Sequence, residues 1–259
     1  MRGLDGKVIV VAGGGTGDAG PGNGAATALR LAEEGARVVV GDLSGSAATR
    51  TREAIEARGG DATSFEFDIA DDTSVRALVD HALDRYGAVD GLHVNAADMS
   101  PEVLGVDSET DLLTIPLAVW QRTLDVNLTG FVLMARAVIP HMLQRGGGGI
   151  TNTVSDAIHA GERVRVAYAT TKLALIGVTH HIASRWGRDG IRCNSISPGI
   201  IARDDETAAN LAATNRREPR SPRAGRPDDV AALATYLLSD DGAWVNGQVW
   251  SVNGGRFLT

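Results

Sequence analysis

The sequence has few residues that could form covalent or metal cross-links. Cys193 is its only cysteine, so no disulfide can form within the chain and a cysteine-rich zinc site is excluded. The six histidines form no H-x-H or H-E-x-x-H pattern, and the adjacent His180 and His181 project in different directions. We therefore expect no metal site, and we interpret Cys193 as a small buried apolar side chain.

Positive charge is also scarce. The formal net charge is −7, and no run of lysine and arginine occurs. Nucleic acids and anionic membrane surfaces bind clustered basic side chains. Neither is therefore expected as a partner.

Long apolar runs are missing as well. The N-terminal segment 1–15 has a short apolar stretch and no small-residue cleavage site, so it does not fit a secretory signal peptide. No segment approaches the ~18 apolar residues of a membrane span. We expect a soluble, cytoplasmic protein.

What the sequence does contain is an alternation of short β-branched runs with longer helical patterns. Several runs are almost unbroken apolar stretches, which is typical of parallel strands covered on both faces. The predicted strands are 7–12, 37–41, 63–67, 91–95, 149–154, 191–197 and 248–252, and the predicted helices are 24–34, 46–58, 74–86, 119–145, 168–188 and 228–238. This order predicts a single α/β domain over residues 1–259, with a doubly wound parallel sheet of about seven strands and helices on both faces.

Two segments are long for simple turns. Residues 98–117 and 202–226 carry prolines and mixed charges, and we predict both as irregular loops. Long loops on the carboxyl side of the strands are where such folds bind ligands. We expect the substrate to be recognised there.

A glycine-rich stretch, AGGGTGDAGPGNGAA, follows the first predicted strand and leads into the first predicted helix. Backbone N–H groups at a helix start, together with the positive end of the helix dipole, bind a pyrophosphate. Asp42 ends the second strand, 18 residues beyond Gly24, where an acidic residue bonds the adenosine ribose. Its charge would repel a 2′-phosphate and the loop holds no Lys or Arg, so the pattern favours NAD over NADP.

A second constellation lies in the helix predicted to begin at Tyr168. Lys172 follows four residues later, so the two side chains share one face. The lysine ammonium would favour the phenolate and bring the tyrosine pKa toward the working range. Such a pair is also common on solvated helices, but Ser155, thirteen residues earlier at the end of a strand, could hold a carbonyl oxygen beside the tyrosine.

Taken together, these residues resemble the classical short-chain dehydrogenase/reductase (SDR) family, which has a single-domain Rossmann fold. The resemblance covers essentially the whole chain. It rests on the glycine turn, Asp42, Asp68, the run Asn95-Ala96-Ala97, Asn127 in LDVNLTG, Ser155, Tyr168, Lys172, the pair Pro198-Gly199 and the ending GRPDDVAALATYLLSDDGAWVNGQVWSVNGG. It implies a cofactor-binding part at roughly 1–155 and a catalytic and substrate-lid part at roughly 155–259.

The resemblance also implies catalytic roles. Tyr168 would be the general acid/base, Ser155 would orient and polarise the substrate oxygen, and Lys172 would bond the nicotinamide ribose and tune Tyr168. Asn127 would hold a water that relays protons from Lys172. The implied cofactor-binding residues are Gly13, Gly22, Asn23, Gly24, Asp42, Leu43, Asp68, Ile69, Asn95, Tyr168, Lys172, Pro198, Gly199 and Ile201.

Several positions depart from the family pattern. Ala97 and Ala12 replace a usual glycine and threonine, and Arg203 stands where a threonine commonly meets the nicotinamide carboxamide, although a solvated lid arginine is the plainer interpretation. The segment 98–117 is longer than usual, which suggests a flap over the substrate mouth. His159 lies in the expected substrate wall.

The glycine loop itself departs most. The literal G-x-G-x-x-G pattern is Gly15, Gly17 and Gly20, but this assignment leaves a poor helix start. The family comparison instead matches Gly13, Gly22 and Gly24, and then five residues within 14–21 are inserted. We expect the insertion to bulge beside the cofactor, and we do not expect the literal G-x-G-x-x-G pattern to bind the pyrophosphate.

The function favoured by these features is an NAD-dependent oxidoreductase that interconverts a secondary alcohol and a ketone by hydride transfer. Scattered apolar residues in the long loops favour a hydrophobic cyclic substrate. The alternatives are a sugar epimerase or dehydratase of the same superfamily, which is usually longer, and a non-catalytic nucleotide-sensing domain. An enoyl reductase is disfavoured because its tyrosine and lysine are usually further apart. The family also implies a homo-oligomer, usually a tetramer.

Overall fold

The computed structural model of the chain describes residues 1–202 and 220–258. The strands are β1 (Val8–Ala12), β2 (Arg37–Asp42), β3 (Asp61–Glu66), β4 (Gly91–Val94), β5 (Gly148–Thr153), β6 (Ile191–Pro198) and β7 (Val249–Val252). The α-helices are α1 (Asn23–Glu33), α2 (Gly45–Glu56), α3 (Asp72–Tyr86), α4 (Val106–Glu109), α5 (Leu117–Leu124), α6 (Gly130–Gln144), α7 (Ala157–Ala160), α8 (Val166–Trp186) and α10 (Pro227–Leu238). Every predicted strand and helix in the described residues is present, which confirms the α/β prediction.

The seven strands form one sheet in the order β3-β2-β1-β4-β5-β6-β7, and all neighbouring strands are parallel. In the register, Ala12 at the end of β1 pairs with Gly41 of β2 and with Val94 of β4. The chain therefore winds outward in one direction through β2 and β3, then crosses to β4 and winds the other way. Such a switch point leaves a crevice beyond the carboxyl ends of β1 and β4.

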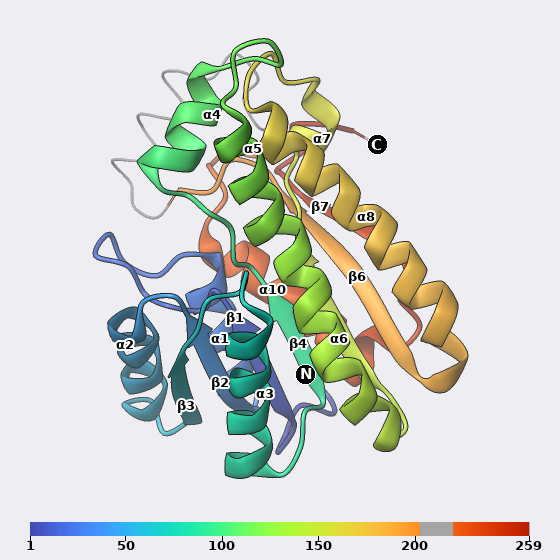
Figure 1. Cartoon of the computed structure of the whole chain (residues 1–259). Helices are drawn as coiled ribbons and strands as arrows, with labels where there is room; N and C mark the ends of the chain where they lie inside the picture. The colour runs from blue at the N-terminus through green and yellow to red at the C-terminus, as the bar shows by residue number, and fades with distance from the viewer. Residues whose placement is uncertain (203–219, 259) are drawn as a thin grey trace.

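Helices cover both faces of the sheet (Figure 1). On one face α3, α6 and α8 bury Leu92, Phe131 and Met134 against the strands. On the other face Val11 and Leu31 belong to the core between the sheet and α1. Cys193 of β6 is buried in the first core, and this burial raises the pKa of its thiol to about 12, as expected of an inert apolar side chain.

The segment 98–117 is not an irregular loop throughout, so that prediction was wrong. Pro101 starts a π-helical turn, η1 (Pro101–Gly105), and α4 follows it directly. Proline suits a helix start because its missing N–H would have no intrahelical partner there. In Figure 1, α4 and α7 lie at the same end of the molecule, beyond the carboxyl ends of the strands.

The predicted helix 119–145 is a continuous helical rod, Leu117–Gln144, made of α5, the π-helical turn η2 (Asp125–Thr129) and α6. The rod is 28 residues long and its most apolar 18-residue window has a mean hydropathy of 1.4, so by length and composition it could span a membrane. By length and composition alone, this rod comes closer to a membrane span than we expected from the sequence. However, 50% of its most apolar window is buried inside the fold, where α6 packs against α3 and β5. Its packing in the core accounts for its apolar composition.

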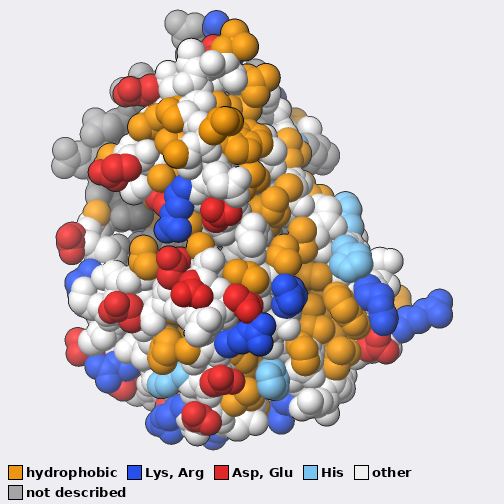
Figure 2. Space-filling view, in the orientation of Figure 1, with side chains coloured by type: hydrophobic (Ala, Val, Ile, Leu, Met, Phe, Trp, Pro, Cys, Tyr) orange, Lys and Arg blue, Asp and Glu red, His pale blue; other side chains and the backbone are white. Residues whose placement is uncertain are grey.

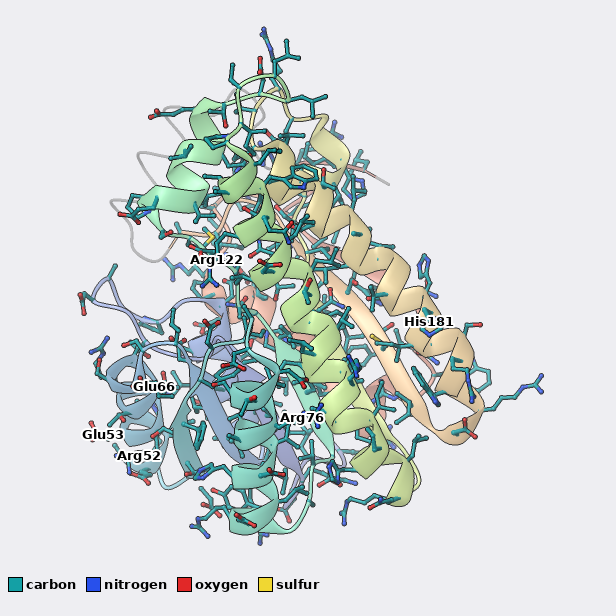
Figure 3. All side chains as sticks on the ribbon, in the orientation of Figure 1. Arg52, Glu53, Glu66, Arg76, Arg122 and His181 are labelled. Carbon is teal, nitrogen blue, oxygen red and sulfur yellow. The ribbon has the colours of Figure 1, made fainter. Side chains whose placement is uncertain are left out.

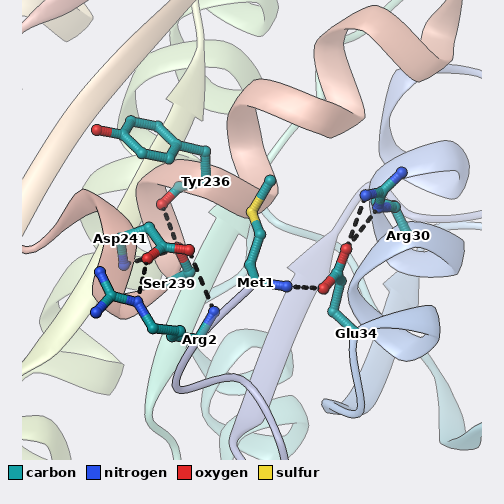
Figure 4. A network of polar contacts seen from close by, with 7 residues as sticks. All are labelled: Met1, Arg2, Arg30, Glu34, Tyr236, Ser239 and Asp241. Carbon is teal, nitrogen blue, oxygen red and sulfur yellow. Dashed lines mark hydrogen bonds and ion pairs between the residues drawn. The ribbon is translucent and has the colours of Figure 1, made fainter.

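Polar contacts tie the start of the chain to two helices (Figure 4). The amino group of Met1 contacts Glu34, which also pairs with Arg30 of α1 at 2.7 Å. The Arg2 side chain donates to Asp241 at 2.6 Å, just after α10. These contacts place the first residues across the packed pair α1 and α10.

His93, on the central strand β4, makes stability depend on pH. The ring is completely buried, its Nδ1 lies 2.9 Å from the Thr151 hydroxyl, and its Nε2 has no hydrogen-bond partner in the described part of the chain. Burial lowers the pKa of His93 from 6.5 to about 4. Because the unfolded state binds this proton below its pKa of 6.5 and the folded state does not, stability falls as pH falls below that value.

We expect His93 alone to remove about 2 kcal/mol of unfolding free energy between about pH 7.5 and about pH 5. Urea titrations at both pH values should show that His93→Val loses this part of the acid sensitivity. His180 is exposed, so His180→Gln serves as the control and should keep the wild-type pH dependence. An unchanged pH dependence in His93→Val would contradict the assignment.

Candidate active site

A cavity of about 740 Å³ lies beyond the carboxyl ends of β1, β4, β5 and β6. Most of the predicted site residues line it: Gly13, Gly22, Asn23, Gly24, Asp42, Asn95, Ser155, Tyr168, Lys172, Pro198, Gly199 and Ile201. The remaining predicted cofactor residues, Leu43, Asp68 and Ile69, line a second cavity of about 390 Å³ that shares Gly13 and Asp42 with the first. The fold thus brings residues from the whole length of the chain to one crevice, while Asn127 lines neither cavity.

Tyr168, Lys172 and Ser155 meet at one end of the main cavity. Tyr168 lies in the first turn of α8, and Lys172 follows one turn later. The Lys172 Nζ donates to the carbonyl oxygen of Thr153 at 2.8 Å and lies 5.5 Å from the centre of the Tyr168 ring. Ser155 follows β5, so the sheet and α8 together fix the relative positions of these side chains.

Desolvation sets the proton affinities of this pair, in which Lys172 is buried and Tyr168 is half-buried. Burial raises the pKa of Tyr168, while a hydrogen bond with Ser155 and the charge of Arg165 act in the opposite direction. Burial lowers the pKa of Lys172 from 10.5 to about 8. The net shift of the Tyr168 pKa is thus opposite to the sequence expectation, because desolvation of the phenolate exceeds the favourable electrostatic effects.

The choice of lysine at this position has a physical reason. Lys7 and Lys172 are the only lysines in the sequence, and arginine supplies the rest of the 25 basic residues. A buried lysine can release its proton near neutral pH, whereas the guanidinium of arginine stays charged. The rarity of lysine was a signal in the sequence that motif spacing alone did not bring out.

Asn127 lies behind the cavity, on the π-helical turn η2. Its side-chain oxygen accepts a hydrogen bond from the backbone N–H of Asp98 at 3.0 Å. Its Nδ2 is buried and has no hydrogen-bond partner among the described residues. Single π-helical turns inside helices often mark functional sites, and this one was not predicted from the sequence.

Asp42, the last residue of β2, also lines the main cavity. Its carboxylate accepts hydrogen bonds from the backbone N–H groups of Gly15 at 2.8 Å and Ser44 at 3.1 Å. A Cβ on Gly15 would come within 2.7 Å of the Asp42 side chain. Glycine at position 15 therefore lets the loop approach Asp42, which is a packing role.

The glycine loop passes over α2 before the chain enters α1. The Thr16 N–H donates to the Ala47 carbonyl at 3.0 Å, and Gly17 and Gly20 close a tight turn at its tip. Gly22 is the N-cap residue of α1. A Cβ on Gly24 would lie 2.0 Å from the Gly13 carbonyl oxygen, so Gly13, Gly22 and Gly24 come together at the helix start, and residues 14–21 form the excursion between them.

Two arginines near the cavities were not found by sequence reasoning. Arg50 of α2 lines the main cavity, donates to the Thr16 carbonyl at 2.8 Å and lies 3.5 Å from Asp18. It places a positive charge near Asp42 although the glycine loop itself holds none. Arg122 of α5, labelled in Figure 3, lines the second cavity and pairs with Asp98 at 3.2 Å. Neither residue belongs to a family motif, so motif spacing gave no signal for either.

One candidate substrate contact, His159, lies away from both cavities. His159 of α7 packs against the ring of Phe257 at 6.0 Å between centroids, and it does not line either cavity. Arg256, the neighbour of Phe257, pairs with Asp156 at 2.9 Å. Arg203 lies outside the described residues.

Comparison with known proteins assigns the family. Residues 19–256 match a family model described as "Enoyl-(Acyl carrier protein) reductase". A protein of Bradyrhizobium diazoefficiens named "Probable short-chain type dehydrogenase/reductase" is 41% identical over 98% of this chain and 89% of its own length. The chain belongs to the short-chain dehydrogenase/reductase family.

Two further relatives have names that state their substrate or ligands. The "Cis-4-hydroxycyclohexanecarboxylate dehydrogenase" of Sinomonas cyclohexanicum is 34% identical over 96% of this chain and 96% of its own. The structure of a 7α-hydroxysteroid dehydrogenase complexed with NADH and 7-oxo glycochenodeoxycholic acid matches with a TM-score of 0.87 at 30% identity, covering 100% of this chain and 97% of that one. This chain is therefore an oxidoreductase that acts on alcohol groups, as a member of a family that uses nicotinamide cofactors. Its substrates are small-molecule alcohols or ketones.

Proposed function

We propose that this SDR enzyme interconverts a secondary alcohol and a ketone with NAD as cofactor, through Tyr168, Lys172, Ser155 and Asn127. The observation that carries the proposal is the convergence of Ser155, Tyr168 and Lys172 in the same cavity as Asp42 and the glycine loop. Residues 1–155 would bind the cofactor, and residues 155–259 would supply the catalytic tyrosine and lysine and the substrate lid.

The start of α1 suits a dinucleotide. The N-cap, Gly22, makes no side-chain capping bond, and the first turn holds no acidic residue, so its backbone N–H groups and the helix dipole favour an anion. The close approach of Gly24 to Gly13 lets the helix start lie against the strand end. Asn95 and Asp42 would hold the adenosine ribose end, and Pro198, Gly199 and Ile201 the nicotinamide end.

A nicotinamide cofactor would supply the hydride acceptor or donor, and the protein would place the substrate and manage the proton. In oxidation the Tyr168 oxygen takes the proton of the substrate hydroxyl, and in reduction it returns a proton to the ketone oxygen. Ser155 holds the same oxygen in position. Lys172, with a pKa of about 8, exchanges a proton near neutral pH, and Asn127 would hold the water that connects it to solvent.

Asp42 supports NAD rather than NADP. Its carboxylate lines both cavities, so a 2′-phosphate bound beside it would meet a negative charge. Arg50 lines the same cavity and would offset part of that repulsion. We infer a preference for NAD in which Asp42 outweighs Arg50.

The substrate we infer is a hydrophobic cyclic secondary alcohol or its ketone. The two named relatives act on a ring-borne hydroxyl or bind a steroid ketone, by their names. Met99 lines the main cavity and the segment beyond it exposes Leu112 and Leu113, which gives an apolar approach. An enoyl reductase, which the family model's description names, fits less well, because Tyr168 and Lys172 are only four residues apart.

Assembly and location follow the same reasoning. Hydrophobic side chains gather on the surface over α5, α6 and α8 (Figure 2), and Leu173 of α8 is exposed there. We infer that copies of the chain associate through this surface and through β7, where Trp250 is exposed, giving a dimer or tetramer. We also infer a cytoplasmic location and no nucleic-acid or membrane partner.

We expect the purified protein to reduce NAD with at least one of cyclohexanol, cis-4-hydroxycyclohexanecarboxylate and glycochenodeoxycholic acid, followed by the absorbance of NADH. Tryptophan fluorescence titrations should show NAD binding about 100-fold tighter than NADP, because a carboxylate near the 2′-phosphate is worth several kcal/mol. Asp42→Asn should narrow this gap to about tenfold or less by improving NADP binding. Equal binding of NAD and NADP by the wild type would refute the role of Asp42.

A further inference from the structure

Asp107 is a buried carboxylate that the mechanism above does not use. It belongs to α4, and its side chain is completely shielded from solvent. A buried carboxylate is costly unless hydrogen bonds satisfy it. Its oxygens accept two such bonds, Oδ1 from the N–H of Ala167 at 3.2 Å and Oδ2 from the N–H of Tyr168 at 2.9 Å.

The start of α8 has no cap of its own. Its N-cap residue, Arg165, makes no side-chain capping bond, and its guanidinium instead pairs with Glu162 at 2.6 Å. Arg165 is also the one non-glycine residue with a positive φ, 61°, within residues 1–202 and 220–258. The first N–H groups of a helix need acceptors from outside the helix, and Asp107 supplies them from 60 and 61 residues earlier in the sequence.

The backbone of Asp107 adds a third hydrogen bond to the start of α8. Its carbonyl oxygen accepts from the N–H of Arg165 at 2.8 Å, which holds the left-handed residue that turns the chain into α8. The Arg165 guanidinium then lies 5.8 Å from the centre of the Tyr168 ring, where its charge opposes the rise of the Tyr168 pKa.

From these contacts we propose that Asp107 is a positioning residue for Tyr168. Its carboxylate fixes the backbone N–H of the tyrosine, while Lys172 anchors the next turn of α8 to Thr153. Together they set the place of the phenol beside Ser155. The middle of the segment 98–117 is then joined to the start of α8, so this segment is not a flap that moves independently of Tyr168.

The consequence is measurable because catalysis depends on sub-ångström placement. A shift of about 1 Å in a reacting group can lower turnover about 100-fold. Asp107→Leu removes both hydrogen bonds and keeps the branched shape with the same number of heavy atoms, and Asp107→Asn keeps one acceptor oxygen. Glu109 is exposed on the same short helix, so Glu109→Gln is the matched control for loss of a negative charge.

The first readout does not need activity. The sequence holds three tyrosines, so protein labelled with 3-fluorotyrosine should give three fluorine NMR resonances, with Tyr168 assigned through Tyr168→Phe. We expect Asp107→Leu and, to a smaller extent, Asp107→Asn to shift the Tyr168 resonance and leave those of Tyr86 and Tyr236 in place. Glu109→Gln should leave all three unchanged.

The second readout rests on the proposed function and uses NAD with the most active alcohol of the panel above. Per mole of folded enzyme, we expect kcat to fall about 100-fold in Asp107→Leu and about tenfold in Asp107→Asn, with the Kd of NADH unchanged within about twofold because Asp107 does not line the cofactor cavity. In the Tyr168→Phe background, Asp107→Leu should cause no further loss, because residues that act as a unit are not additive.

The two readouts separate the possible failures. If no alcohol is oxidised, the proposed function fails, and the Tyr168 resonance still tests the role of Asp107. If Asp107→Asn lowers only the melting temperature, with the Tyr168 resonance and kcat as in the wild type, the positioning role is refuted. Asp107→Asn keeps the shape of the side chain, so the test does not depend on the folding of Asp107→Leu.

Discussion

Replacement of Tyr168 by phenylalanine should lower kcat for alcohol oxidation by about 1,000-fold, because a positioned general acid/base contributes about 10²–10⁴-fold. The substitution removes one oxygen atom from a half-buried ring on α8. The Kd of NAD, measured by tryptophan fluorescence, should stay within about threefold of the wild type, since the cofactor contacts of the glycine loop and Asp42 are untouched.

The pH dependence should change together with the rate. Burial raises the pKa of Tyr168, so its phenolate form is scarce near neutral pH and becomes more abundant only as pH rises. Wild-type oxidation should therefore accelerate toward alkaline pH. The residual rate of Tyr168→Phe should lack this rise. A Tyr168→Phe variant that keeps both its rate and its pH profile would show that another group is the acid/base.

The second large effect is expected in the glycine loop. A Cβ at position 24 would lie 2.0 Å from the Gly13 carbonyl oxygen, so Gly24→Ala should force the helix start away from the strand. We expect NAD affinity to fall roughly 100-fold, which corresponds to the loss of about 3 kcal/mol of hydrogen bonding to a charged group. Alanine is a better helix former than glycine, so α1 itself should not weaken.

Gly17→Ala is the matched control. Gly17 belongs to the literal G-x-G-x-x-G pattern, yet a Cβ there would meet nothing within 4 Å. We expect nearly wild-type NAD affinity from this variant, with circular dichroism showing that both variants are folded. If NAD affinity falls in Gly17→Ala and is retained in Gly24→Ala, the literal G-x-G-x-x-G pattern binds the pyrophosphate and our assignment is wrong.

Much of the fold could be predicted because each element carries its own local signal. β1 is almost entirely β-branched and β2 contains a run of three valines. Glycines with positive φ lie where helices α1 and α3 end, at Gly35 and Gly87. The order of strand and helix then allows few topologies. The same order places Asp42, Asn95 and Ser155, which lie at or just after the ends of β2, β4 and β5, at one edge of the sheet.

Contacts between distant segments could not be predicted in this way. The hydrogen bond from Tyr168 to Asp107 depends on how α8 packs against α4. The approach of Arg50 to the glycine loop depends on how that loop packs against α2. Hydrophobic periodicity records which face of a helix is buried, but it does not record which residue of another element lies opposite. The π-helical turn at Asn127 is likewise a local departure that the apolar period of the rod conceals.

The sequence alone determined the doubly wound sheet, the family resemblance and the residue types of the candidate site, because periodicity, glycine positions and motif order are local properties. The tertiary structure decided the rest. It showed that residues 14–21 lie over α2, that burial shifts the pKa of Lys172 to about 8, and that the segment 98–117 anchors the start of α8 through Asp107. These features depend on which groups are desolvated and which backbone donors find an acceptor, and both are set only when the chain has packed.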